Sequence, residues 1–404
     1  MSEKNKILIC SAVFPPEPVV SATLSKDLAE TLSKEYSVTV LCPRPTRPYG
    51  FSFTESPESA AGYEKVTLNS YTSPKSGFVG RFVESYSFGL ACAEYFKKHH
   101  QEIKLVYLNV WPLCAQYIMV KAARKYGTPV ILHVQDIYPE SLLKKLPCEI
   151  IRRIANGILL PFDRKIQEMA DHVIVISENM RRHLRQTRNI SDEKMTTVVN
   201  YQNEQDFLAC SCVQKSDDAP VTFMYLGNIG PVARVDWLIQ SFAGAGLASA
   251  RFVIAGSGSR KEECMRLAQN YPDAKIEFQD VPGGKVPEVQ SQADVMLISL
   301  AEGAAMSSIP SKIPAYMFSG KAILGALDMQ SDTAKAIIES GGTVTDPNDV
   351  NAFIEELRKY AGKSRSELAE LGKKSLAYGL QHFSKERNLG SLIKVMKDFY
   401  HENK

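Results

Sequence analysis

The sequence predicts an α/β protein with two doubly wound parallel sheets, one in each half of the chain. Three observations lead to this fold class. Short apolar runs of strand type alternate with helical segments in both halves, which is the pattern of parallel strands joined by helices. The length of 404 residues is that expected of two domains. A polar stretch at 200–218 separates the halves. We expect domains at residues 1–205 and 206–383, followed by a C-terminal helix at 384–404.

The first half supplies five apolar runs that we assign to strands, at 6–10, 38–41, 105–108, 130–133 and 173–177. Helices are expected between them, at about 21–34, 79–98 and 121–125 and in a region that ends at 170. The stretch from 42 to about 63 looks irregular. Ligands of such sheets bind at the carboxyl ends of the strands. The loops at 11–21, 133–140 and 177–180 are therefore the candidates for ligand contacts in this half.

The second half repeats the pattern, with strands expected at 221–226, 252–255, 276–278, 295–300 and 322–324. Helices are expected from about 235, from 261 and at 312–319, and the tail from 349 to 404 is helical in pattern. Because both halves present strand ends, a ligand cleft between facing domains is the expected arrangement, and such a cleft can close by hinge motion.

The most informative stretch is 302–325, which reads EGAAMSSIPSKIPAYMFSGKAILG. Ser311 is a good helix N-cap, Pro314 fits the first turn and Gly320 suits the stop. The helix at 312–319 would begin near a strand's carboxyl end, where unpaired amides and the helix dipole favour anions. Lys312 adds a full positive charge, so the stretch suits a phosphate or diphosphate. The alternative is a capped connection with a solvated lysine.

Two glycine loops follow strands of the second half. Gly227, Asn228 and Gly230 predict a tight turn, with Arg234 at the start of the next helix, where it could bind a phosphate. The alternative is a turn with a surface arginine. In AGSGS, Gly256 and Gly258 resemble part of a dinucleotide fingerprint, but position 261 is Lys rather than the third Gly. A strand-to-helix turn is the better default there.

Composition excludes several classes of protein. A net charge of +3 gives no nucleic-acid signal. Eight Cys without a CxxC or a Cys/His cluster indicate free thiols in a reducing compartment and argue against structural zinc. The N-terminus enters a strand directly, and no run approaches the ~20 apolar residues of a membrane span. We expect no signal peptide and a cytoplasmic protein.

A peripheral association with the inner face of the plasma membrane stays open. The segment 142–165 intersperses Lys and Arg with Leu and Ile, a pattern that can lie on an anionic membrane surface. The alternative is a buried amphipathic helix with a solvated basic face.

Nine stretches, in order, carry a resemblance to a known family: FPPEP, VQDIYPES, ADHVIVISENM, NYQNEQDF, YLGNIG, FVIAGSGSRKEE, ADVMLISL, PSKIPAYMFSGKAIL and HFSKE. Through them the chain resembles the retaining glycosyltransferases of family 4, which have the two-domain GT-B fold. It is most similar to members from bacterial capsule, O-antigen and exopolysaccharide clusters that carry a Pro-Ser-Lys motif. The resemblance implies that the C-terminal helix at 384–404 crosses back to the first domain.

The resemblance also implies roles for individual residues. Lys312, Arg234 and the loop of Gly227, Asn228 and Gly230 would bind the donor diphosphate. The remaining donor contacts are expected from the second half, at Gly256, Ser257, Asp280, Ser307, Ser308 and Ser311. In the first half, the expected contacts are His133 with the donor sugar, Asp136 with the acceptor hydroxyl, and Glu17 and Glu140 with the acceptor. For His133 the alternative is a histidine at a strand end whose hydrogen bonds are all made within the protein. For Asp136 the alternative is a residue that caps a turn or a helix.

The main departure from the family is its pair of Glu residues eight positions apart. In this chain the two positions are Ser307 and Ala315. The second Glu usually holds the nucleotide ribose, so the ribose contacts must come from elsewhere; Glu302 could reach the sugar from the preceding loop. The loop after PPE also lacks the family's glycines.

The implied activity is transfer of a sugar, with retention, from a nucleotide-sugar to a glycan or polyprenyl-diphosphate-linked acceptor. UDP is the expected nucleotide and GDP the alternative. The absence of an Asp-x-Asp motif predicts a reaction without metal or other cofactor. Two other functions stay open: a nucleotide-sugar 2-epimerase-like isomerase on the same fold, and a catalytically degenerate protein that only binds sugar nucleotides.

Overall fold

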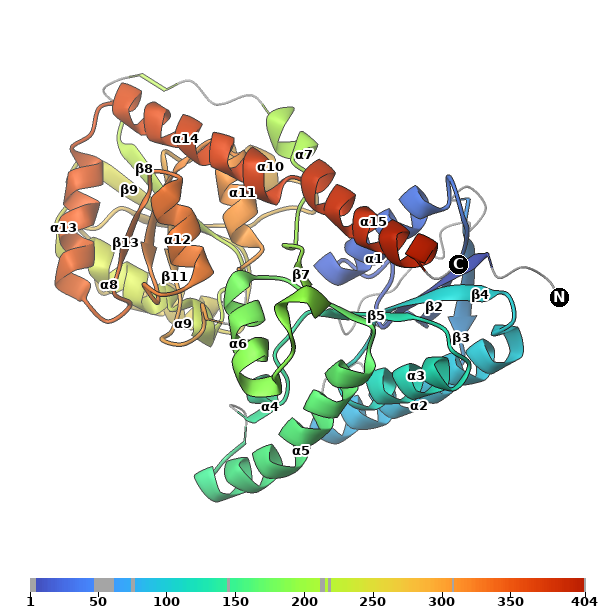
Figure 1. Ribbon diagram of the computed structural model, residues 1–404. Coiled ribbons are helices and arrows are strands. Elements are labelled where there is room, and N and C mark those ends of the chain that lie inside the picture. The colour runs from blue at the N-terminus through green and yellow to red at the C-terminus, as the bar shows by residue number, and fades with distance from the viewer. Residues whose placement is uncertain are drawn as a thin grey trace. The chain divides into compact units, whose positions relative to one another are not determined.

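A computed structural model describes residues 5–46, 62–73, 77–143, 146–210, 215–216, 219–306 and 309–402. The chain divides into two units, residues 1–200 together with 388–404, and residues 201–387. The sequence prediction had placed these boundaries after residues 205 and 383. Each unit has a parallel sheet of its own (Figure 1). Each also has its own hydrophobic core.

The sheet of the first unit has seven parallel strands in the order β3-β2-β1-β4-β5-β6-β7. Its strands are β1 (Lys6–Ser11), β2 (Ser37–Pro43), β3 (Glu64–Leu68), β4 (Ile103–Asn109), β5 (Val130–Val134), β6 (His172–Val175) and β7 (Met195–Thr197). The helices are α1 (Val20–Leu32), α2 (Phe78–His99), α3 (Cys114–Lys125), α4 (Glu140–Leu143), α5 (Glu149–Met169) and α6 (Glu178–Arg188). The central strands are buried along almost their whole length, as expected when helices cover both faces.

The sheet of the second unit has six parallel strands in the order β10-β9-β8-β11-β12-β13. Its strands are β8 (Val221–Leu226), β9 (Ala250–Ala255), β10 (Ile276–Gln279), β11 (Val295–Ser299), β12 (Ala322–Ala326) and β13 (Thr343–Thr345). The helices are α7 (Gln205–Leu208), α8 (Val235–Ala245), α9 (Lys261–Ala268), α10 (Val286–Ser291), α11 (Lys312–Phe318), α12 (Asp332–Glu339), α13 (Val350–Ala361) and α14 (Arg365–Phe383). The predicted fold class is confirmed. Strands β3, β7 and β13 were not predicted.

The order of each sheet reverses once, at β1/β4 in the first unit and at β8/β11 in the second. Such switch points open a crevice at the carboxyl ends of the strands, and ligands bind there. In the second unit the crevice is bordered by the loop after β8 and by the segment from β11 to α11.

Helix α11 begins at Lys312 and ends at Phe318, close to its predicted bounds. Gly320 ends it with φ +62°, as the sequence predicts. The prediction for Ser311 is wrong, because its side chain makes no capping hydrogen bond. Ser311 has helical backbone angles rather than the extended ones of an N-cap, and its carbonyl accepts a hydrogen bond from Gln202 Nε2 at 2.5 Å.

Helix α14 holds α11 in place through two glycines. A Cβ on Gly372 would lie 2.0 Å from the carbonyl oxygen of Gly320, and one on Gly379 would lie 2.8 Å from Cβ of Met317. Only glycine permits the two helices to approach so closely. The tail therefore fixes the segment that carries Lys312.

The last helix, α15 (Lys385–Glu402), continues the helical tail, and its residues from 388 onward belong to the first unit. Tyr400 Oη donates a hydrogen bond to the carbonyl of Asn5 at 3.0 Å. Lys397 pairs with Glu35 at 2.7 Å. Within the described parts of the chain, no helix is long and apolar enough to cross a membrane.

Candidate functional site

The second unit contains a cavity of about 450 Å³ at the carboxyl end of β8, a volume typical of small-molecule sites. The loop after β8, the start of α11, helix α10 and the segment around α7 form its walls. Its lining residues are Gln202, Asn203, Asp206, Phe207, Leu226, Gly227, Asn228, Gly284, Val286, Pro287, Gln290, Ser311, Lys312 and Ala315. Four predicted donor-site residues thus meet in one cavity: Gly227, Asn228, Ser311 and Lys312.

Lys312 supplies the positive charge of this cavity. Its Nζ donates a hydrogen bond to Tyr225 Oη at 2.7 Å and lies 4.4 Å from the centroid of that ring. Tyr225 Oη in turn donates to the carbonyl of Asn228 at 2.7 Å. Burial lowers the pKa of Lys312 to about 8. Among the residues that the structure describes, no carboxylate forms an ion pair with Lys312. The site therefore holds a desolvated cation that an anionic ligand would stabilise.

Gly256 and Gly258 allow the loop after β9 to pack closely against the loop after β8. A Cβ on Gly256 would lie 2.2 Å from the carbonyl oxygen of Gly227, and one on Gly258 would lie 2.3 Å from that of Ile229. The backbone of Ile229 donates to the carbonyl of Ser257 at 2.8 Å. The loop after β9 thus supports the loop after β8 from behind, which agrees with the strand-to-helix turn favoured for AGSGS. Direct ligand contacts by Gly256 and Ser257 stay a prediction.

Arg234 and Glu302 are joined by a residue that sequence reasoning missed. Arg234 has φ +46°, and its Nη1 donates to the carbonyl of Pro347 at 2.6 Å and to Asn348 Oδ1 at 3.2 Å. Asn348 Nδ2 donates to Glu302 Oε2 at 3.2 Å. The loop after β13 therefore orients both predicted residues. Its sequence, DPND, signals only a turn, so the link could not be found without the structure.

In the first unit, His133 is buried at the carboxyl end of β5. Its Nδ1 lies 2.5 Å from Tyr107 Oη and its Nε2 lies 2.9 Å from Gln135 Nε2. Burial lowers the pKa of His133 to about 3, so the imidazole is neutral near pH 7. Both ring nitrogens already have partners, and the predicted contact with a donor sugar would have to displace Gln135.

Glu140 is the centre of an ion-pair cluster in the first unit. It accepts two hydrogen bonds from the buried Arg188, at 2.6 and 2.7 Å, and one from His183 at 2.7 Å. Burial raises its pKa, but these hydrogen bonds outweigh that effect and hold the pKa at about 2. Arg188 also contacts Asp163 at 2.9 Å and the carbonyl of Tyr138. This cluster fixes the loop after β5, and contact of Glu140 with an acceptor stays a prediction.

The other predicted residues are dispersed. Glu17 is buried after β1, where its Oε1 accepts from the backbone of Thr46 at 2.8 Å. Asp136 is exposed after β5. Asp280 is exposed after β10 and pairs with Lys261 at 2.5 Å. Ser307 and Ser308 lie outside the described residues.

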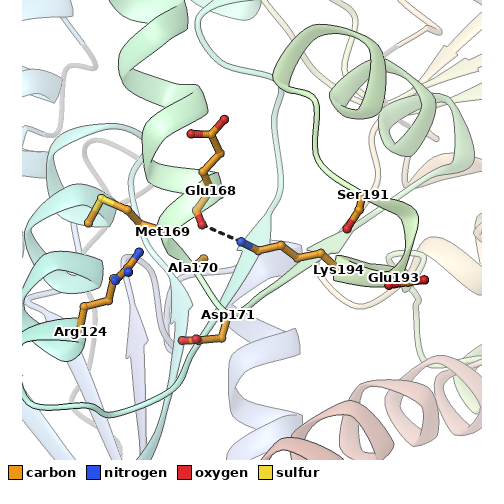
Figure 2. A pocket seen from close by; sticks show the side chains of 8 residues that line it. All are labelled: Arg124, Glu168, Met169, Ala170, Asp171, Ser191, Glu193 and Lys194. Atoms are coloured by element: carbon orange, nitrogen blue, oxygen red, sulfur yellow. Dashed lines mark hydrogen bonds between the residues drawn. The ribbon is translucent and has the colours of Figure 1, made fainter.

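A second hollow, of about 510 Å³, lies in the first unit between the end of α5 and the segment before β7 (Figure 2). Lys194 and Asp171 line it, and both side chains already have hydrogen-bond partners within the protein. Lys194 Nζ donates to the carbonyl of Glu168 at 2.7 Å, and Asp171 accepts from the backbone of Val130 at 2.8 Å. Val130 begins β5 and Asp171 precedes β6, so this hollow lies at the amino ends of the strands. It is on the edge of the sheet opposite to where ligands of such folds bind.

The described residues contain no group of three or more His, Cys, Asp or Glu side chains that could hold a metal ion. The charge available to a ligand of the cavity comes from Lys312, and Asp206 is the one carboxylate among its lining residues in the described chain.

Family models match segments in both halves of the chain. Residues 21–200 match the model of the glycosyl transferase 4-like domain, and residues 220–362 match that of the glycosyl transferases group 1. Both of these models describe domains of glycosyltransferases. A curated relative, the probable glycosyltransferase WbjE of Pseudomonas aeruginosa, is 23% identical over 241 residues, which span 55% of this chain and 57% of that protein.

Solved structures share the fold over nearly the whole chain. Sucrose-phosphate synthase from Thermosynechococcus elongatus has a TM-score of 0.72 at 16% identity, with 98% of this chain and 99% of that one covered. Alr3699/HepE of Anabaena, solved in complex with UDP and glucose, has a TM-score of 0.65 at 14% identity, with 98% and 100% covered. The chain thus has the GT-B fold.

Proposed function

We propose that this protein is a retaining glycosyltransferase that moves a hexosyl group from UDP-sugar to a glycan or lipid-linked acceptor in the synthesis of a bacterial surface polysaccharide. The observation that carries the proposal is the desolvated Lys312 in the cavity at the end of β8, which forms an ion pair with no carboxylate of the described residues. A nucleotide diphosphate is a ligand that such a cation stabilises. The UDP complex of the Anabaena neighbour supports UDP as the nucleotide.

In this mechanism the leaving UDP gains negative charge as the bond to the anomeric carbon breaks. Lys312 meets that charge, and because the site around it is desolvated, the interaction is stronger than it would be in water. The hydrogen bond from Lys312 to Tyr225 orients the ammonium group before the donor arrives. The leaving phosphate takes the proton of the attacking acceptor hydroxyl on the same face, which retains the configuration. No metal ion or other cofactor takes part.

Arg234 is the second cation of this proposal. It lies on the loop that begins with Gly227, and its contacts to the loop after β13 hold it at the start of α8. Glu302, which accepts a hydrogen bond from Asn348, is the proposed acceptor of hydrogen bonds from the hydroxyls of the transferred sugar. For the first unit, contact of His133 with the donor sugar and contact of Asp136 with the acceptor stay predictions from the sequence.

The deciding experiment compares UDP, GDP, CDP and ADP for thermal stabilisation of the purified protein, with and without EDTA. We expect stabilisation by UDP above the others and no effect of EDTA. Incubation with UDP-sugars and an acceptor, followed by detection of UDP and of a new glycosidic product, then tests transfer. A new sugar nucleotide formed without acceptor would instead favour the isomerase. Stabilisation by none of the four would favour a degenerate protein.

We further propose that the amino-terminal half of α5 contacts the membrane that carries a lipid-linked acceptor. This half contains no buried residue, and in Figure 1 it extends past the rest of its unit. Ile150, Ile154 and Ile158 are 73%, 60% and 67% exposed, and their spacing of four residues places them on one helix face. Arg153 lies beside them, paired with Glu149 at 3.4 Å. An exposed isoleucine ridge of this kind can enter the boundary between headgroups and acyl chains.

Flotation with vesicles of phosphatidylglycerol and phosphatidylethanolamine tests this contact. We expect the protein to float with the vesicles, and Ile154→Ser combined with Ile158→Ser to leave most of it in solution. The control is Ile338→Ser, which removes an isoleucine of the second unit that is 48% exposed. Equal flotation of the double variant and the control would refute the membrane role of α5.

A further inference from the structure

One wall of the cavity contains a buried amide that the residue roles assigned so far do not use. Gln290 of α10 is only 1% exposed, yet it lines the cavity together with Lys312. Its Oε1 accepts a hydrogen bond from Ser319 Oγ at 2.5 Å. In the described part of the chain, its Nε2 has no hydrogen-bond partner. Buried polar groups in native proteins are rarely left without partners, so a ligand is the expected partner of this amide.

The amide keeps one free polar atom in either of its two orientations. Ser319 Oγ also lies 3.0 Å from the carbonyl of Ala315, to which it can donate its single proton. If Ser319 donates there, it can accept from Nε2 of a flipped Gln290, and Oε1 is then the free atom. A hydroxyl group can both donate and accept a hydrogen bond. It is therefore a suitable partner for Gln290 in both orientations.

The position of Gln290 relative to Lys312 indicates which hydroxyl this is. Lys312, Ala315 and Ser319 follow one another on the same face of α11, at a spacing of three and four residues. Lys312 marks the phosphate end of the cavity, and Gln290 contacts the far end of this row through Ser319. Ala315 lies between Lys312 and Ser319 in this row, and it lines the cavity together with Gln290. In a nucleotide-sugar the diphosphate joins two groups that carry hydroxyls, the ribose and the transferred sugar, and only the ribose is bonded to a base.

The apolar side chains of the cavity fit the same ligand. Phe207, Val286 and Pro287 line it beside Gln290. An apolar wall with a single amide suits a neutral sugar and base, whereas the charge of the ligand is met at Lys312. Most ligand sites share this division between apolar walls and a few placed polar groups.

We propose that Gln290 binds a ribose hydroxyl of the donor nucleotide and that Ser319 positions its amide. The inference rests on the proposed function, because it assumes that a nucleoside diphosphate occupies the cavity. It assigns the ribose contact to a residue of α10, which the sequence did not mark as part of the site.

The test measures binding of UDP, 2′-deoxy-UDP and 3′-deoxy-UDP by isothermal titration calorimetry. The wild-type protein should bind UDP about tenfold more tightly than at least one deoxy analogue, which is the discrimination expected of one hydrogen bond to a buried group. Gln290→Leu, which keeps the size of the side chain, should bind all three alike. Ser319→Ala should reduce the discrimination without abolishing it.

The control is Gln292→Leu. Gln292 lies two residues after Gln290 and is not among the residues that line the cavity, so this variant should keep the wild-type preference. Melting temperatures establish that each variant is folded, and Gln290→Met replaces Gln290→Leu if the latter is not. Equal wild-type affinity for the three nucleotides, or an unchanged preference in the folded Gln290 variant, overturns the inference and leaves the proposed function standing. Absence of binding by any nucleotide to the wild-type protein overturns the proposed function itself.

Discussion

Lys312 owes its properties to the residues around it. The sequence marks it through its place at the start of a helix, and the structure adds Tyr225, whose hydroxyl joins the ammonium group to the carbonyl of Asn228. An aromatic residue within an apolar strand is ordinarily a core residue, so no sequence pattern places Tyr225 in the site. Gln290 escaped prediction for a similar reason, since a glutamine on a short helix is usually solvated.

Replacing Lys312 with alanine should weaken UDP binding and slow sugar transfer. Loss of one charge-assisted hydrogen bond to phosphate costs ~1.5–3 kcal/mol, which should be seen in kcat/KM for the donor. The matched control is Lys335→Ala, which removes an exposed lysine of α12 in the same unit. Wild-type kcat/KM in Lys312→Ala would exclude a role for this lysine in the reaction.

Affinity for UDP should fall as the pH rises above 8. Burial lowers the pKa of Lys312 to about 8 in the empty site, so the side chain is charged below that pH and neutral above it. A bound diphosphate favours the charged form and raises this pKa, so binding takes up a proton. Above pH 8 the loss should approach ~tenfold per pH unit, because one pH unit is ~1.36 kcal/mol.

Calorimetry of UDP binding between pH 7 and 9.5, in buffers of different ionisation enthalpy, measures both the affinity and the proton uptake. The range lies above the second phosphate pKa of ≈ 6, so titration of the phosphate does not interfere. Lys312→Met should lack both the pH dependence and the proton uptake. An affinity that is flat to pH 9.5 in the wild-type protein would contradict the assignment.

At the scale of elements, the sequence predicts best where a pattern is long. The buried central strands and the long helix α2 fall within a few residues of their predicted limits. The strands that it misses are β3, β7 and β13. Two of these have only three residues, and β3 is half-exposed with a mixed polar pattern. Such strands form because a neighbouring strand offers unpaired backbone groups. That neighbour is distant in the sequence, so the local pattern does not predict the strand.

The pair of glycine loops behind the cavity leads to a prediction about stability. Gly256→Ala would place a Cβ 2.2 Å from the carbonyl oxygen of Gly227 and would force an alanine to φ +128°. The backbone strain alone costs of the order of 1–3 kcal/mol, and relief of the clash would displace the loop after β8. We expect a lower melting temperature and weaker UDP binding. Gly283→Ala is the control, because no atom lies within 4 Å of a Cβ there. If both variants behaved alike, the packing of the two loops would not matter to the site.

At the scale of the molecule, the alternation of strands and helices was sufficient to predict two doubly wound sheets, because parallel strands require crossovers and most crossovers are helices. It could not predict which residues the sheets bring together. Arg234 and Asn348 are 114 positions apart, and Tyr225 and Lys312 are 87 apart. These contacts depend on the strand order β8-β11-β12-β13 and on loop conformations, neither of which is encoded in local patterns.

Because the described residues that line the cavity all belong to the second unit, its ligand should stabilise that unit first. At a UDP concentration of 100 times Kd, binding stabilises the folded state by ≈ 2.7 kcal/mol. Hydrogen exchange measured by mass spectrometry, with and without UDP, should therefore show slower exchange in peptides covering 226–230, α10 and α11. Uridine, which lacks the diphosphate, is the control and should protect the region around Lys312 much less. Protection by UDP that is confined to peptides of the first unit, around β1 and β5, would move the nucleotide site there. The roles assigned to Lys312 and Gln290 would then both be lost.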